Sequence, residues 1–68
     1  MYFNLKMALI EKGVSIETAA KLLKIHRNTL SAKINGKAKF YIEEVCQLRD
    51  NYFPEKSLDM LIDKRNVA

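Results

Sequence analysis

The sequence predicts an all-α domain of five short helices, and three observations support this fold class. Apolar side chains recur every three or four residues in most of the chain, which is the period of an amphipathic helix. Gly13, Gly36 and Pro54 separate these periodic stretches at points where helices commonly end. The chain has 68 residues, of which 49% are apolar, so it can form one small core. We expect a single domain over residues 1–63 and a disordered tail over residues 64–68.

The first two helices are expected on either side of Gly13. The first, over about residues 4–12, would begin at Asn4, since an Asn side chain can accept a hydrogen bond from the free amides of a first turn. Gly13 would end that helix, because glycine readily adopts the left-handed conformation. Ser15 is a favourable N-cap for a second helix over residues 16–23.

A tight turn over residues 24–26 should lead into a third helix over residues 27–35. Leu30 and Ile34 are four residues apart, so both would point into the core. Gly36 follows as the residue after the end of the helix. The opposite side of this helix is short, polar and basic, and it carries no acidic residue.

The fourth helix is expected over residues 42–52, and Pro54 bars its continuation. Ser57 would cap a short last helix over residues 58–62. The carboxylates of the last third of the chain, Glu44 among them, are expected to face solvent and to lie away from the basic side.

The positive charge of the chain is concentrated between Glu17 and Glu43. No acidic residue lies between them, whereas half of the twelve Lys and Arg residues do, and the rest of the chain is slightly acidic. The formal charge of +4 therefore comes from this segment. Clustered positive charge on two helices joined by a tight turn is the pattern expected of a DNA-binding surface. Its basic residues are Lys21, Lys24, Arg27, Lys33, Lys37 and Lys39.

Composition argues against several other classes of protein. His26 and Cys46 are the single histidine and the single cysteine, so a four-ligand zinc site and a catalytic constellation both lack the residues they need. We expect no enzyme activity, metal, cofactor or small-molecule ligand. A lone cysteine cannot form an internal disulfide, and no apolar run approaches the ~20 residues of a membrane span or the pattern of a signal peptide. We expect a cytoplasmic protein.

Residues 16–36 read IETAAKLLKIHRNTLSAKING. This stretch resembles the helix-turn-helix of phage Cro and repressor proteins, the XRE type. The resemblance depends on Ala20 in the second helix, on the apolar Ile25 after the turn, and on the run Thr-Leu-Ser over residues 29–31. The order of the flanking helices extends it over nearly the whole chain.

The resemblance implies a sequence-specific regulator of transcription, of phage or prophage origin, that binds double-stranded DNA on the nucleoid of a bacterial or phage-infected cell. In this family the second helix crosses the DNA backbone and the third enters the major groove. Base edges would then be contacted by Arg27, Asn28, Ser31 and Ala32. Phosphates would be contacted by Thr18, Lys21, Thr29, Lys33, Asn35, Lys37 and Lys39.

Two residues depart from the family pattern. Ile16 occupies the first position of the second helix, where the family usually has a Gln that contacts DNA. Lys24 occupies the turn, where the family favours glycine because the chain often needs a positive φ there. A residue other than glycine in that conformation costs on the order of 1 kcal/mol. We therefore expect Lys24→Gly to raise stability and to weaken DNA binding through the lost charge.

A homodimer is expected, at least on DNA, because two domains related by a two-fold axis can read a palindrome. The alternative is a helical protein-interaction module, such as an antitoxin or antirepressor, whose function depends on the same apolar surface. Charge reversal at Arg27 and Lys33 would distinguish them, since only a DNA reader should lose activity. The surface in question comprises Tyr52, Phe53, Leu58, Met60, Leu61 and Ile62.

Overall fold

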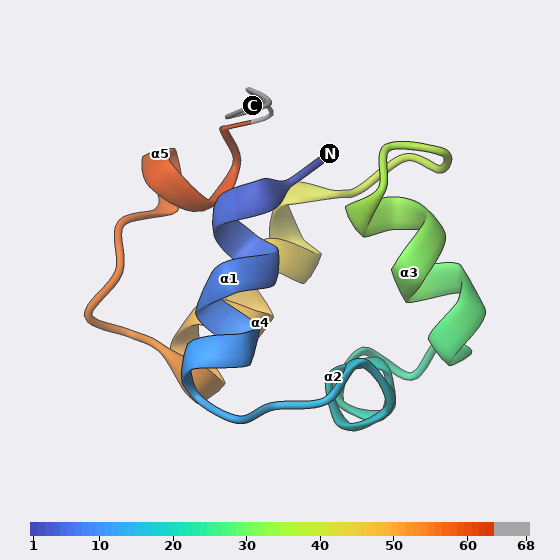
Figure 1. Cartoon of the computed structure of the whole chain (residues 1–68), viewed down its shortest axis with the longest axis horizontal. Coiled ribbons are helices and arrows are strands. Elements are labelled where there is room, and N and C mark those ends of the chain that lie inside the picture. The colour runs from blue at the N-terminus through green and yellow to red at the C-terminus, as the bar shows by residue number, and fades with distance from the viewer. Residues whose placement is uncertain (64–68) are drawn as a thin grey trace.

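A computed structural model of the chain describes residues 1–63 and shows an all-helical arrangement in that range, which confirms the predicted class (Figure 1). The predicted tail, residues 64–68, lies outside the described residues. In Figure 1, α1 runs through the middle of the view, α5 lies to its left, and α2 and α3 lie to its right. The helices are α1 (Phe3–Glu11), α2 (Ile16–Leu23), α3 (Arg27–Ile34), α4 (Ile42–Tyr52) and α5 (Leu58–Leu61).

One hydrophobic core joins all five helices. α2 packs on both α3 and α4, and the buried Ala19 and Ala20 keep the side-chain layer between these helices thin. α1 packs on α3 and α5, and α4 packs on α5. Each large apolar side chain withdrawn from water contributes about 1.5–3 kcal/mol to stability. The largest fully buried side chains are Phe53, Leu5, Leu9, Leu30, Leu48, Leu61 and Val45.

Most helix ends lie where the local signals place them. The hydroxyls of Ser15 and Ser57 each accept a hydrogen bond from the backbone N–H three residues later, at 3.0 and 3.1 Å, so both residues are N-caps. Gly13 and Gly36 follow the ends of α1 and α3 with φ of +70° and +82°. Caps of this kind contribute about 1 kcal/mol each.

The start of α1 differs from the prediction, because Asn4 is not its N-cap. Tyr2 takes that position, and its backbone N–H donates to the carbonyl of Ile34 at 2.8 Å. The Tyr2 ring also packs edge-on against Phe40, with 5.2 Å between ring centroids. These tertiary contacts start the helix earlier, and the Asn4 amide instead donates to the carbonyl of Met60 at 3.0 Å.

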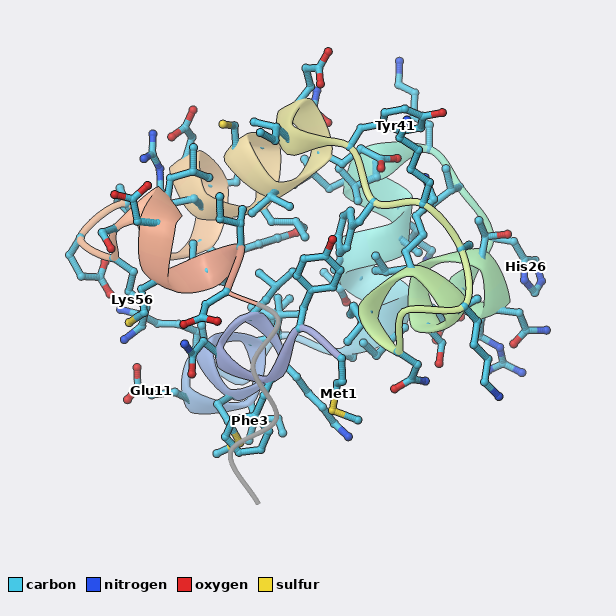
Figure 2. All side chains as sticks on the ribbon, turned by 90° about the horizontal axis from the view of Figure 1, so that it is seen from above. Met1, Phe3, Glu11, His26, Tyr41 and Lys56 are labelled. Carbon is cyan, nitrogen blue, oxygen red and sulfur yellow. The ribbon has the colours of Figure 1, made fainter. Side chains whose placement is uncertain are left out.

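Two surface ion pairs connect α1 to the segment between α4 and α5. Lys56 Nζ lies 3.0 Å from Glu11 Oε1, and Lys12 Nζ lies 2.9 Å from Glu55 Oε2. Figure 2 shows Glu11 and Lys56 on the same side of the molecule, far from His26. The hydrogen bond from Lys12 lowers the pKa of Glu55. Such exposed pairs add little stability, but they neutralise the charge of this side.

Candidate nucleic-acid interface

α2 and α3 are joined by a three-residue turn. Lys24 has φ 59° and ψ 40°, the left-handed conformation that the resemblance implies for this turn. The backbone N–H of Ile25 donates to the carbonyl of Ala20 at 3.0 Å, and the Ile25 side chain packs against the core. Nδ1 of His26 accepts from the backbone N–H of Asn28 at 3.1 Å, so the histidine caps α3. The turn thereby sets the angle between the two helices (Figure 1).

The first turn of α3 presents polar side chains to solvent. Arg27 and Asn28 are exposed, and Ser31 and Ala32 are half-buried one turn further along. Residues separated by three or four positions lie on one side of a helix, so these four predicted base-contacting residues share a side. Leu30 and Ile34 are buried on the inner side, as their spacing predicts.

Exposed cations lie at both ends of α3, with Lys21, Lys24 and Arg27 near its start and Lys37 just after its end. Within residues 1–63, none of these four cations forms an ion pair. One acidic residue comes close, since Glu17 lines a shallow depression of about 430 Å³ between α2 and α3, together with Lys21 and Arg27. Among the described residues that line this depression, Glu17 is the acidic one and Lys21 and Arg27 are the cations.

Most of the residues predicted to contact phosphate are exposed, and they lie on α2, on α3 and in the loop that follows α3: Thr18, Lys21, Thr29, Asn35, Lys37 and Lys39. The Thr18 hydroxyl accepts from Ser15 Oγ at 2.9 Å. Nζ of Lys39 lies over the ring of Tyr41, 5.3 Å from its centroid. Thr18 and Lys39 are therefore held by neighbours, while both remain at the surface.

Lys33 is the exception, and its prediction as a phosphate contact is wrong in this structure. Its side chain is only 11% exposed, and its Nζ lies 2.6 Å from Oε2 of Glu44. Position 33 follows Leu30 by three residues and therefore turns toward the core side of α3. Glu44 does not point into solvent either, since Oε1 accepts from the backbone N–H of Tyr41 at 3.0 Å.

The predicted dimer surface is also corrected. Phe53 and Leu61 are 0% exposed and belong to the core. Tyr52, Leu58 and Ile62 are half-buried and pack against that core. Met60, at 38% exposure, is the one member of the predicted set that remains exposed. These apolar side chains close the core where α5 packs against α1 and α4, so they are not available as a flat external surface.

Exposed apolar side chains are found in other places. Met7, Ile10 and Met60 line a depression of about 390 Å³ between α1 and α5, and Glu11 and Lys56 lie beside it. We call these three residues the α1–α5 apolar patch. Sequence reasoning missed Met7 and Ile10, although both fall outside the periodic inward positions of α1.

Within residues 1–63, no group of three or more His, Cys, Asp or Glu is placed to hold a metal ion. None of the helices in that range has the length and apolar character needed to cross a bilayer. Comparison with protein-family models found no match, and comparisons with curated proteins and with solved structures found none either. Any proposal about function therefore depends on the geometry of α2, α3 and their surroundings.

Proposed function

We propose that this protein is a sequence-specific, double-stranded-DNA-binding regulator of transcription of the Cro/repressor kind. One observation carries the proposal: the exposed start of α3, where Arg27 and Asn28 stand among cations that have no carboxylate partner within residues 1–63. A surface that combines free cations with hydrogen-bonding side chains on a projecting helix suits a nucleic acid.

In this proposal α3 lies in the major groove, which is about 12 Å wide and admits a helix. The guanidinium of Arg27 can donate two hydrogen bonds to a guanine, and the amide of Asn28 can bond an adenine in the same bidentate way. Ser31 and Ala32 follow one turn later, where a hydroxyl can bond a base edge and a methyl can contact thymine.

The surrounding residues would supply affinity and register, without sequence choice. Lys21, Lys37 and Lys39 carry the charge for phosphate contacts, and Thr18, Thr29 and Asn35 add hydrogen-bonding groups. Lys33 is omitted from this set because Glu44 holds its ammonium. α2, positioned by the left-handed Lys24, would cross the DNA backbone.

The regulator would act as a homodimer on a palindromic operator, because one domain contacts only a few base pairs. With Phe53 and Leu61 in the core, the α1–α5 apolar patch becomes the favoured contact surface. Its flanking charges, Glu11 and Lys56, are of opposite sign, so two copies of this face do not repel.

Selection of bound fragments from random duplexes, followed by salt titration, tests the proposal. We expect a recovered palindrome, and a slope of about −4 to −5 in log K against log salt if about five phosphates are neutralised per subunit. A weak, salt-independent interaction without sequence preference would contradict it. That outcome would favour a protein-interaction module such as an antitoxin or antirepressor, for which the α1–α5 apolar patch is the supporting observation.

A further inference from the structure

We propose that Glu44 is a positioning residue for α3, which it acts on through the buried Lys33. The inference rests on the proposed function, in which α3 contacts the bases. Lys33 lies in the last turn of α3 and Glu44 in the first turn of α4, with side chains only 11% and 18% exposed. Neither residue would touch DNA.

Both oxygens of the Glu44 carboxylate are engaged. Oε2 accepts from Lys33 Nζ at 2.6 Å, and Oε1 accepts from the backbone N–H of Tyr41 at 3.0 Å. Tyr41 is the N-cap of α4, where backbone amides would otherwise lack partners. A single carboxylate therefore connects the end of α3 to the start of α4.

The ring of Tyr41 extends this link into the loop between the two helices. Nζ of Lys33 lies 5.4 Å from the ring centroid and Nζ of Lys39 lies 5.3 Å from it, within the range of cation–π attraction. Figure 2 shows Tyr41 at the rim of the molecule, where the chain enters α4. Lys39, one of the proposed phosphate contacts, is thus held by the ring that packs near Lys33.

The backbone packing of α3 explains why such a link matters. α3 packs mainly on α2 and to a smaller extent on α1, whereas its backbone makes little contact with α4. Within residues 1–63, the contact between Lys33 and Glu44 is the one hydrogen bond or ion pair that joins α3 to α4. This charge-assisted bond is short and largely shielded from water, so it restrains the rotation and tilt of α3.

Specific and non-specific DNA binding depend differently on that restraint. Bidentate contacts to bases require side chains held to about 0.5 Å and 10–20°. Phosphate contacts made by long lysine side chains tolerate a less defined helix orientation. Loss of the Lys33–Glu44 link should therefore weaken binding to the operator more than binding to an arbitrary duplex.

The test compares Glu44→Gln with Glu43→Gln, which removes the same charge from an exposed neighbour on α4. Affinity is measured for the selected operator and for a random duplex of equal length. We expect Glu44→Gln to lower the operator-to-random ratio on the order of 10-fold, the discrimination of about one bidentate contact. Glu43→Gln should leave the ratio unchanged.

Lys33→Met separates this role from a direct phosphate contact. A phosphate contact would lower both affinities equally and reduce the salt slope by about 1. A positioning role leaves the slope unchanged and lowers operator binding alone. If α3 shifts to bring Lys33 onto DNA in the complex, the reduced slope of this variant will overturn the proposal.

Glu44→Gln leaves a buried ammonium without its partner, which destabilises the fold. The double variant Lys33→Met, Glu44→Gln removes both charges and keeps a well-folded reference, which circular dichroism can verify. Positioning predicts that the double variant still loses discrimination. If the double variant regained the wild-type operator-to-random ratio, the Lys33–Glu44 pair would contribute to stability alone, and the inference would be overturned. A wild-type protein with no operator preference would overturn the proposed function and this inference together, whereas a wild-type preference that Glu44→Gln retains overturns only the inference.

Discussion

The stretch from Glu17 to Glu43 and the stretch over residues 52–62 place their side chains in opposite ways. Most cations of the first remain at the surface, whereas the large apolar residues of the second mostly enter the core. Burial of an unpaired charge costs several kcal/mol, whereas burial of an apolar side chain is favourable. A prediction from sequence that charged side chains lie at the surface is therefore more reliable than the same prediction for apolar side chains. Lys33 is buried because Glu44 pairs with it.

The largest effect concerns the apolar stretch. Phe53→Ala should destabilise the fold by about 3–5 kcal/mol, because it deletes a fully buried ring and leaves a cavity. Ile42→Ala is the control, since this side chain is 55% exposed, lies outside the α1–α5 apolar patch and should cost less than about 1 kcal/mol. Urea unfolding at several protein concentrations measures both. If the two variants lost equal free energy of unfolding, and the loss depended on protein concentration, Phe53 would instead belong to a dimer interface.

The cationic stretch gives the next effect, on DNA binding. Arg27→Glu should weaken operator binding by about 100-fold or more, since it removes a base contact and repels phosphate. Lys12→Glu makes the same change in net charge on the neutral side of the molecule, where Lys12 pairs with Glu55. It should weaken binding only a few-fold. Equal losses in a fluorescence anisotropy titration would show that net charge, and not the start of α3, determines binding.

A smaller effect is expected on self-association through the α1–α5 apolar patch. Ile10→Glu should raise the dimer dissociation constant by at least about 10-fold, because it places a charge in an apolar contact. Ile42→Glu is the matched control, since Ile42 is 55% exposed and Ile10 is 59% exposed. Sedimentation equilibrium measures both. A wild-type protein that stays monomeric with and without operator would remove the dimer proposal.

The smallest effect is expected for a substitution in the turn between α2 and α3. Lys24→Gly should raise stability by up to about 1 kcal/mol, because glycine adopts a φ of 59° without steric cost. The same change should weaken DNA binding a few-fold through the lost charge, in the range of one phosphate contact. Thermal unfolding and an anisotropy titration check the two parts separately. A lower melting temperature would show that Lys24 contributes packing that glycine lacks.

Local patterns in the chain predicted a large part of this fold. The bounds of α2 and α4 and the serine caps of α2 and α5 appear in the structure as expected. These features depend on neighbours within a few residues, so short-range rules suffice for them. The sequence did not indicate the capping role of Glu44, because the N-cap residue of α4 is Tyr41 and a capping box usually has Ser or Thr at that position.

Long-range contacts decided the remaining features. Asn4 bonds Met60, which is 56 residues away, so tertiary packing overrode its local preference for an N-cap. Lys33 became a buried partner of Glu44, and Phe53 and Leu61 entered the core. Helical periodicity predicts that the chain makes helices, and the distribution of acidic and basic residues along the sequence shows where its positive charge is concentrated. The helix that packs opposite determines which cation forms an ion pair and which apolar side chains are buried. That helix is known only from the tertiary structure.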